Sequence, residues 1–273
     1  METKNTVTPS FNFSGNIPFH YDRYLGPLYF EPYALEIAKR IDPSRVKIAL
    51  EIACGTGRVT RHLRTIIPST SKLIASDISP DMVGVAKEKL KTADIDWQIF
   101  DAQDLPIDDN SIDLVVCCFG FMFVPDKLKA FSEIYRILKP GGTFLFSTWD
   151  SLEFNGASFV HRNAARKYLE DLTPESYLLP FSMNDDNMIK KALREVGFLS
   201  IIIERVDKVA ASPTAKEAAF GIVRGGPFYN ELMKRNPAWI DELQTAVEKE
   251  LVEKFGASPM AAPMRALVID AKK

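Results

Sequence analysis

A chain of 273 residues with 46% hydrophobic and 26% charged residues can form one large α/β domain, or one domain with a lid. Its formal net charge of −2 provides no basic excess for a nucleic-acid partner, and no apolar run reaches the roughly 18–20 residues of a membrane span. Residues 1–18 are mostly polar and contain no apolar signal core, so we expect a polar leader on a cytoplasmic protein. The 3 cysteines lack the CxxC spacing of a zinc site, and no metal is expected.

Strand-like and helix-like segments alternate from residue 45 to residue 150. The expected strands are apolar and rich in β-branched residues, and they cover residues 46–53, 73–77, 95–100, 112–119 and 143–149. Helices are expected between them, over residues 58–67, 80–91 and 127–138. Apolar strands separated by helices indicate an α/β fold with a doubly wound sheet, which binds its ligand beyond the carboxyl ends of the strands.

The pattern changes on both sides of this core. The segments outside it are a helical segment over the ligand site (19–44), an irregular cap insertion (151–184), a continuation of the core with a strand at 199–206 (185–211), a helical insertion (212–261) and a final strand (262–273). The second insertion suits a lid or a homodimer contact. The alternative for both insertions is a packing subdomain with no ligand role.

The stretch ALEIACGTG at residues 49–57 ends the first strand in a glycine turn. Gly55 and Gly57 let the backbone turn sharply and approach a ligand without a Cβ in the way. The helix that follows turns its free N–H groups toward the same place. Asp77 follows Gly57 by 20 residues, a spacing from which an acid can accept hydrogen bonds from ribose hydroxyls. With Asp101 after the third strand, a tight turn or an acid ends three successive strands.

Two nucleoside-containing ligands compete for this turn. A dinucleotide site requires a third glycine, and Thr60 occupies that position in the G-x-G-x-x-G pattern. S-adenosylmethionine carries no phosphate, and Glu51 before the glycines suits its ammonium group better than it suits a pyrophosphate. The sequence therefore favours the sulfonium cofactor. The alternatives are a cofactor-binding protein without catalysis and an NAD-dependent oxidoreductase.

At this point five stretches, taken in order over residues 45–150, resemble the class I S-adenosylmethionine-dependent methyltransferases: LEIACGTGRVTRHL, ASDISPDMV, DAQDLPI, IDLVVCCFGFMFVPD and ILKPGG. They are most similar to the small-molecule branch that includes the ubiquinone and menaquinone C-methyltransferases. The resemblance implies a Rossmann-like, seven-stranded sheet with an antiparallel last strand, and ALVIDAKK suits that strand. It also implies S-adenosyl-L-methionine as cofactor and a small-molecule substrate.

The resemblance assigns cofactor-binding residues as well. It implies a cofactor turn at Glu51, Ala53, Gly55 and Gly57, a ribose acid at Asp77, adenine contacts at Ile78, Met82, Asp101 and Ala102, and a sulfonium end at Cys118 and Phe119. Many relatives have glycine where Ala53 stands, but a methyl group there is small. Tyr21 or Tyr24 is expected to reach the methionine carboxylate, the alternative being an aromatic stripe packed on the sheet. Arg58 is a further candidate, or else a solvated helix residue.

The expected reaction is an in-line displacement at the methyl carbon. The leaving group is a neutral thioether, so the protein needs mainly to align the reactants and exclude water. A general base is needed only if the acceptor holds its proton at neutral pH. His161 in the first insertion is the candidate base, ahead of His20 and His62, and a surface or core histidine is the alternative at each position.

The segment FGFMF offers an apolar acceptor pocket. Phe119, Met122 and Phe123 are the residues expected to line it, and core packing beneath the next helix is the alternative. Enzymes that methylate base amines often carry an acid or asparagine, two prolines and an aromatic here, whereas this chain has Cys118-Phe119-Gly120-Phe121, so DNA or RNA is not the expected acceptor. The aromatic insertions favour a mostly apolar acceptor, aromatic or lipid-like. Methylation at carbon, oxygen or nitrogen stays open, with a quinone-precursor C-methyltransferase and a secondary-metabolite O-methyltransferase as two options.

Overall fold

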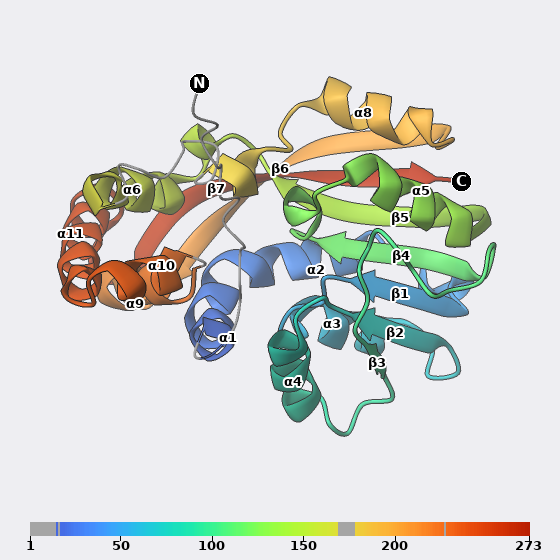
Figure 1. The fold of residues 1–273 in the computed structure, drawn as a ribbon, viewed down its shortest axis with the longest axis horizontal. Coiled ribbons are helices and arrows are strands. Elements are labelled where there is room, and N and C mark those ends of the chain that lie inside the picture. Colours follow the sequence, from blue (N-terminus) through green and yellow to red (C-terminus); the bar gives the residue numbers. More distant parts are fainter. Residues whose placement is uncertain (1–14, 16, 169–177, 227) are drawn as a thin grey trace, which may run out of the picture.

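The computed structural model describes Gly15 and residues 17–168, 178–226 and 228–273. Within these residues the strands form one seven-stranded sheet in the order β3-β2-β1-β4-β5-β7-β6 (Figure 1). The strands are β1 (Ile48–Ile52), β2 (Lys72–Ser76), β3 (Asp96–Gln98), β4 (Ile112–Cys118), β5 (Leu138–Trp149), β6 (Ser200–Ser212) and β7 (Met260–Lys272). β1 to β5 pair in parallel, and β7 is antiparallel to both β5 and β6. The predicted Rossmann-like sheet with an antiparallel last strand is confirmed.

Helices cover both faces of this sheet close to where the sequence predicts them (Figure 1). They include α3 (Arg58–Ile66), α4 (Pro80–Lys89), α5 (Lys127–Ile137) and α8 (Asp186–Glu195). Side-chain caps fix where three of them begin, because Ser79 accepts from the N–H of Met82, Asp126 from that of Lys129 and Asp185 from that of Asn187. Short 3₁₀ turns connect other elements: η2 (Pro43–Arg45), η3 (Phe121–Phe123), η4 (Leu152–Phe154), η5 (Arg166–Tyr168) and η6 (Leu179–Phe181).

The two strands β6 and β7 are longer than the sequence predicts. Each has 13 residues, and their antiparallel ladder continues from Ser200 opposite Lys272 to Ser212 opposite Met260. The expected strands ended at residue 206 and began at residue 262. Because the two strands satisfy each other's backbone hydrogen bonds, they can project beyond the core sheet as a ribbon.

Within the described part of the chain, four helices gather around the projecting ends of β6 and β7 and form a cap (Figure 1). The cap consists of α6 (Gly156–Ala165), α9 (Ala215–Arg224), α10 (Phe228–Arg235) and α11 (Ala238–Phe255). Both predicted insertions thus contribute helices to one body. Buried residues from α9 and α11, among them Ala219, Leu243 and Val247, join the same apolar core as the sheet.

The N-terminal segment lies between the cap and the sheet (Figure 1). It comprises α1 (Ile17–His20), the π-helical η1 (Tyr21–Phe30) and α2 (Glu31–Lys39). Residues 1–14 and 16 of the predicted leader lie outside the described residues, whereas Ile17 and Pro18 belong to α1 and are buried. Among the helices that the structure describes, none has the length and apolar character needed to cross a bilayer.

Candidate active site

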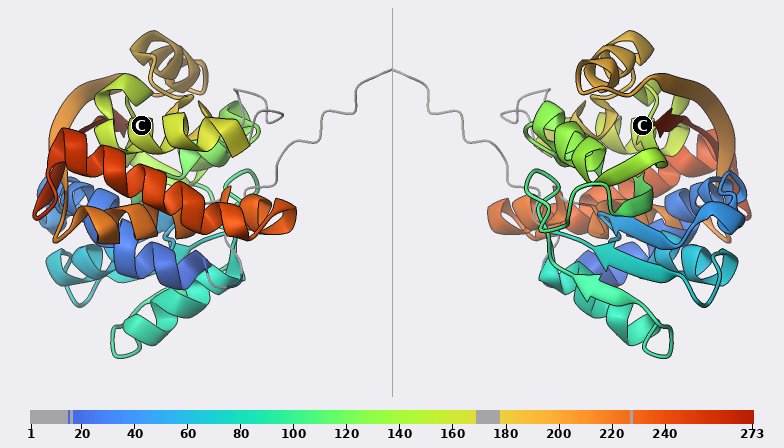
Figure 2. Two further views of the ribbon diagram at one scale, coloured as in Figure 1. Left: turned by 90° about the vertical axis from the view of Figure 1, so that its left-hand side faces the viewer. Right: turned by 90° about the vertical axis from the view of Figure 1, so that its right-hand side faces the viewer.

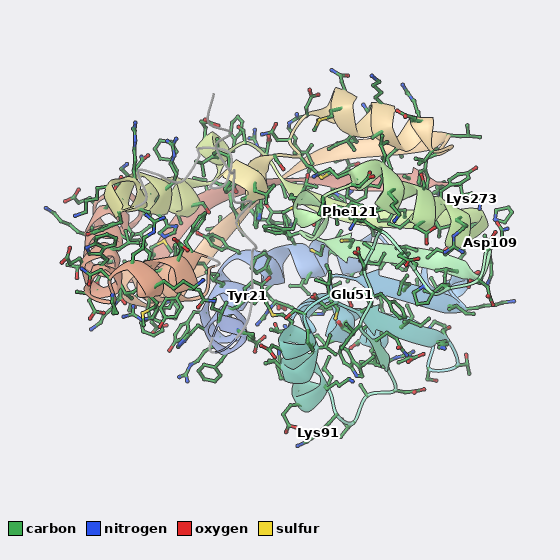
Figure 3. The ribbon with its side chains drawn as sticks, viewed as in Figure 1. Tyr21, Glu51, Lys91, Asp109, Phe121 and Lys273 are labelled. Atoms are coloured by element: carbon green, nitrogen blue, oxygen red, sulfur yellow. The ribbon has the colours of Figure 1, made fainter. Side chains whose placement is uncertain are left out.

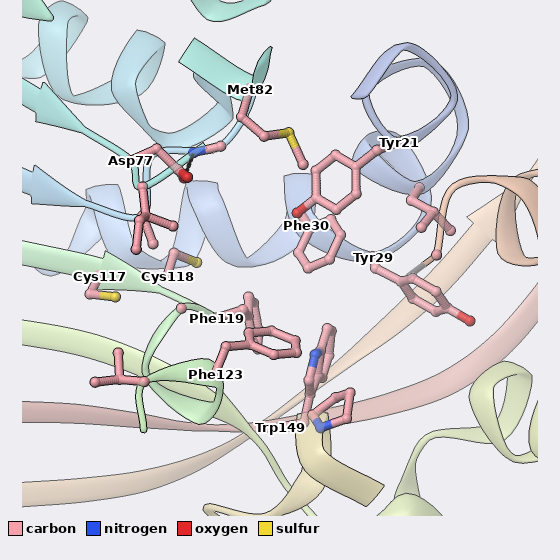
Figure 4. Close-up of a pocket in the computed structure, with 18 of the residues that line it drawn as sticks. Tyr21, Tyr29, Phe30, Asp77, Met82, Cys117, Cys118, Phe119, Phe123 and Trp149 are labelled. Carbon is pink, nitrogen blue, oxygen red and sulfur yellow. Dashed lines mark hydrogen bonds between the residues drawn. The ribbon is translucent and has the colours of Figure 1, made fainter. Parts of the chain in front are cut away.

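A cavity of about 410 Å³ lies beyond the carboxyl ends of the parallel strands, where the sheet meets η1 and the cap (Figure 4). One side is built from the ends of β1, β2 and β4 and the turns that follow them. The other side comes from η1, the end of β5, α6 and the connection between α9 and α10. The volume lies within the range of ordinary small-molecule sites.

The glycine turn after β1 forms part of this wall. Gly55 and Gly57 adopt left-handed backbone angles, with φ of +55° and +78°, which side chains other than glycine rarely tolerate. A Cβ placed on Gly55 would meet no heavy atom within 4 Å, so the turn borders open space. A Cβ on Gly57 would lie 3.1 Å from the Cβ of Ala86, because α3 and α4 approach closely there.

Ala53 also has a left-handed backbone, with φ of +55°, and is accommodated by a glycine opposite it. A Cβ on Gly120 would lie only 2.4 Å from the Cβ of Ala53 and 2.8 Å from Sγ of Cys117. The methyl group of Ala53 therefore uses space that Gly120 leaves free. This contact explains why the chain can carry alanine in the turn.

The carboxylate of Asp77 connects the first two turns of the wall. Its Oδ2 accepts from the N–H of Gly55 at 2.8 Å (Figure 4). Its Oδ1 accepts from the N–H of Ser79, also at 2.8 Å. Burial raises the pKa of Asp77 above its ordinary value, although both N–H bonds act in the opposite direction. In the next turn Asp101 accepts from the N–H of Gln103 at 2.9 Å and also lines the cavity.

Aromatic rings form the part of the wall beyond β4 and β5 (Figure 4). The Phe119 ring stacks on Trp149 with 4.0 Å between centroids, and Phe119 has a φ of +59°, an uncommon value for a bulky residue. Phe30 meets Phe119 edge to face at 5.6 Å and stacks on Tyr21 at 4.9 Å. Together these rings make this part of the cavity wall apolar.

Three polar side chains lie on the cap side of the cavity. Ser158 Oγ donates a hydrogen bond of 3.3 Å to the Tyr29 hydroxyl, and both residues line the cavity with His161. Burial lowers the pKa of His161 to about 4, so its imidazole is neutral at physiological pH. A neutral imidazole can accept a proton or a hydrogen bond from a bound hydroxyl group.

The cavity thiols are poor nucleophiles in this environment. Burial raises the pKa of Cys118 to about 12, so the thiolate is scarce at neutral pH. No group of three or more His, Cys, Asp or Glu residues is placed to hold a metal ion in the described ranges. The chemistry that these residues favour is binding, alignment and hydrogen-bond acceptance.

Comparison with known proteins decides the family. A profile described as a methyltransferase domain matches residues 50–146. The demethylmenaquinone methyltransferase of Staphylococcus aureus (strain JH9) is 36% identical over 207 residues, which cover 68% of this chain and 83% of that protein. The enzyme of the same name from Staphylococcus epidermidis is 30% identical over 209 residues, covering 69% and 84%. The chain belongs to the class I S-adenosylmethionine-dependent methyltransferases.

A solved structure agrees with this methyltransferase fold. Phosphoethanolamine N-methyltransferase 2 of Haemonchus contortus, in complex with phosphomonomethylethanolamine and S-adenosylhomocysteine, has a TM-score of 0.62 and 19% identity. The match covers 100% of this chain and 61% of that protein. Membership of this family makes S-adenosylmethionine the cofactor and rules against the dinucleotide alternative. The open space at Gly55 and the carboxylates of Asp77 and Asp101 fit a ligand with a ribose and an adenine.

Most of the predicted site residues of this methyltransferase lie together. Those that line the cavity are Tyr21, Ala53, Gly55, Asp77, Ile78, Met82, Asp101, Ala102, Cys118, Phe119, Phe123 and His161. Those outside its lining are Tyr24, Glu51, Gly57, Arg58 and Met122. Gly57 instead shapes the start of α3, as its N-cap.

Glu51 lies within the sheet, beneath the glycine turn (Figure 3). Its side chain is buried, at 1% exposure, beside Thr60 on α3. Burial raises the pKa of Glu51 to about 8, which keeps the carboxyl largely protonated at neutral pH. From this position the Glu51 carboxyl is not part of the cavity wall. It can act on the cofactor's ammonium group only through the glycine turn.

Arg58 points away from the cavity, toward the N-terminal segment. Its guanidinium binds Glu31 Oε2 at 2.8 Å and the carbonyl oxygen of Asp22 at 2.8 Å. Gly26 passes so close that a Cβ there would lie 2.3 Å from the guanidinium. The prediction of cofactor contact missed these partners because they lie about 30 residues earlier in the chain.

Two other predicted contacts pack elsewhere. The Tyr24 ring lies 4.9 Å from Phe220 on α9, and its Cβ sits against Gly221. Met122 is fully buried in η3, with its side chain in the core, as the alternative for FGFMF anticipates. Tyr24 therefore fastens η1 to the cap, and Met122 supports the wall from behind.

Sequence reasoning missed several cavity residues. They are Leu25, Tyr29, Phe30, Trp149, Ser158, Phe181, Ile222 and Phe228, together with further lining residues. Trp149 ends β5, so its position at the carboxyl edge of the sheet was a usable signal. Ile222 and Phe228 lie in cap helices, and no local pattern shows which way such helices face.

Proposed function

We propose that this methyltransferase transfers the methyl group of S-adenosylmethionine to a flat, apolar aromatic acceptor that carries a ring hydroxyl, such as a reduced quinone precursor. The observation that carries the proposal is that the aromatic wall of Phe30, Phe119 and Trp149 lines the same cavity as the polar side chains of Ser158 and His161. An aromatic wall favours a flat apolar ligand, and a polar side chain in the same cavity suits one hydroxyl. The names of the two staphylococcal relatives point to an acceptor of this chemical class.

The cofactor would occupy the sheet side of the cavity. Asp77 would accept the ribose hydroxyls, and Asp101 would accept from the exocyclic amine of adenine. Ile78, which is 69% exposed, would contact the adenine and become covered on binding, and Met82, which is already buried, would contact it from the cavity wall. The methionine end would extend past Gly55 toward the aromatic rings.

The bound cofactor supplies an electrophilic methyl group whose leaving group is a neutral thioether. The protein's part is to align the acceptor and exclude water, and the proton that the acceptor loses passes to solvent after the transfer. Phe119 and Trp149, which already stack on each other, would contact the acceptor ring as one apolar surface, and η1 with the cap would close over it. His161 would accept the ring hydroxyl's hydrogen bond, which raises electron density on the ring as the new bond forms.

A methyl-transfer assay on purified full-length protein tests the acceptor class. S-adenosylmethionine labelled in its methyl group is mixed with a short-chain demethylmenaquinol, a monohydroxylated naphthalene or phosphoethanolamine, and products are identified by mass spectrometry. We expect label in the aromatic compounds and none in phosphoethanolamine. Label in phosphoethanolamine alone, or in no aromatic acceptor, would reject the proposed acceptor class.

A further inference from the structure

The outermost strand of the sheet, β6, has an edge that no strand of the described residues covers. β6 is the last strand in the sheet order and runs along the rim of the molecule (Figure 2). Its Ile202 and Val209 side chains are 54% and 53% exposed. A long unpaired edge offers backbone N–H and C=O groups to a strand of another chain. Natural proteins usually either block such strand pairing or use it for assembly.

Charged residues lie at equal distances on either side of the middle residue of β6, and the two members of each such pair have opposite signs. The strand reads SIIIERVDKVAAS, and Val206 is the central residue of its 13. If two copies of β6 pair antiparallel with Val206 opposite Val206, Glu204 faces Lys208 and Arg205 faces Asp207. The two-fold axis repeats each pair, so four contacts between opposite charges form and no like charges lie opposite each other.

This complementarity also selects one register. A shift by one residue in one direction places Glu204 opposite Asp207, and a shift in the other direction places Arg205 opposite Lys208. Either shift opposes like charges, which is unfavourable in cross-strand pairs. In the symmetric register Ile203 also faces Val209, which pairs two branched apolar residues.

We propose that β6 is a homodimer interface, in which a second copy of this chain adds its own β6 antiparallel with Val206 on the two-fold axis. The two sheets then form one continuous sheet, and the active sites stay separate. This places the dimer contact on the sheet edge rather than on the helices of residues 212–261.

Each of the four charged residues already has a partner within its own copy. Glu204 lies 2.8 Å from Arg40, the C-cap of α2, and Lys208 lies 2.8 Å from Glu36 within α2. Arg205 pairs with Asp150 and Asp186, and Asp207 pairs with Arg265. The Glu204 side chain is still 55% exposed, so it can reach a second cation. In the dimer four side chains form a row of alternating charge across the axis. Arg40 and Glu204 come from one copy, and Lys208 and Glu36 come from the second copy. Alternating networks stabilise more than isolated surface pairs do.

Sedimentation equilibrium of the full chain tests the interface with a charge exchange. We expect wild type to dimerise reversibly, and Glu204→Lys or Lys208→Glu to raise the dimer dissociation constant about tenfold or more, since each creates two like-charge contacts. The double variant E204K/K208E restores opposite charges across the axis and should return to near wild type. Within one copy, E204K places a positive charge beside Arg40, and K208E places a negative charge beside Glu36. If the single variants weakened the dimer only through these contacts, the double variant would stay weak.

Three results would overturn this interface. They are a monomeric wild type at every concentration, a dimer that both single variants leave unchanged, and a double variant as weak as the singles. Circular dichroism and S-adenosylhomocysteine binding establish that each variant is folded. If a single variant does not fold, Arg205→Asp, Asp207→Arg and their combination provide the same exchange one position nearer the axis.

Discussion

A buried carboxyl beneath the cofactor turn gives this methyltransferase a pH-dependent stability. The pKa of Glu51 is raised to about 8 in the folded protein by burial, against an ordinary value of 4.5. The folded state therefore binds more protons than the unfolded state between these two values. Its contribution to stability is complete below about pH 4.5 and is lost as pH rises toward about 8.

Glu51→Gln should remove this dependence because an amide does not titrate. Between about pH 5 and about pH 8, the wild-type free energy of unfolding should fall by about 3 kcal/mol more than that of the variant. Urea denaturation across this pH range measures both. Glu88→Gln, at a side chain that is 78% exposed, is the control and should follow wild type. Parallel pH profiles for wild type and the Glu51 variant would contradict the assignment.

His161 should act as a neutral hydrogen-bond acceptor for the acceptor substrate. His161→Ala should lower kcat about 100-fold with a hydroxylated acceptor and leave S-adenosylhomocysteine affinity unchanged. With a pKa of about 4, wild-type His161 should produce no inflection in kcat near the ordinary histidine pKa. His20→Ala is the control, since the His20 ring packs against Phe220 outside the cavity lining. An unchanged turnover rate in the His161 variant would exclude this role.

At the scale of elements, an ionic group ties η1 to the cofactor turn. Asp22 on η1 accepts a hydrogen bond of 2.7 Å from Thr56 Oγ1 in the turn, and it also contacts Arg58 and Lys89. Glu31 receives Arg58, Arg61 and His62; burial alone would raise its pKa, but these partners together lower it to about 2. Since η1 carries cavity residues, this group positions one wall against the other.

Arg58→Met should loosen η1 over the site. We expect a loss of about 2–3 kcal/mol in the free energy of unfolding and an approximately tenfold weaker affinity for S-adenosylhomocysteine. Arg61→Met shares the partner Glu31 but removes a side chain that is 42% exposed, so its effect should stay below about 1 kcal/mol. Urea denaturation and calorimetric titration measure both quantities. Equal effects of the two substitutions would show that Arg58 has no special role in holding η1.

The sequence predicts the elements of the core well and the cap poorly, for a physical reason. Strand ends such as Asp77 and Phe119 could be assigned because parallel strands bring their carboxyl ends to one edge, whatever the rest of the chain does. Arg58 and Tyr24 were assigned to the cofactor because helix position alone does not reveal a partner on a distant element. The side chains of Asp22 and Phe220 decide those contacts, and they follow only from the packed structure.

At the scale of the whole molecule, the cavity joins two bodies. The core sheet supplies one wall, while η1 and the cap supply the other, and β6 and β7 connect the cap to the sheet (Figure 1). A ligand that touches both walls should therefore stabilise the contact between them, even where a segment touches no ligand atom.

Amide hydrogen exchange with S-adenosylhomocysteine should reveal this coupling. Exchange should slow at the turn of residues 53–57 through direct contact, and also in η1 and α9, because closing the cavity fixes the second wall. The helix α8 lies on the sheet outside the cavity lining and should exchange at the same rate with and without ligand, which makes it an internal control. Protection confined to the turn would mean that the cofactor product binds the sheet alone, and that only the acceptor closes the cap.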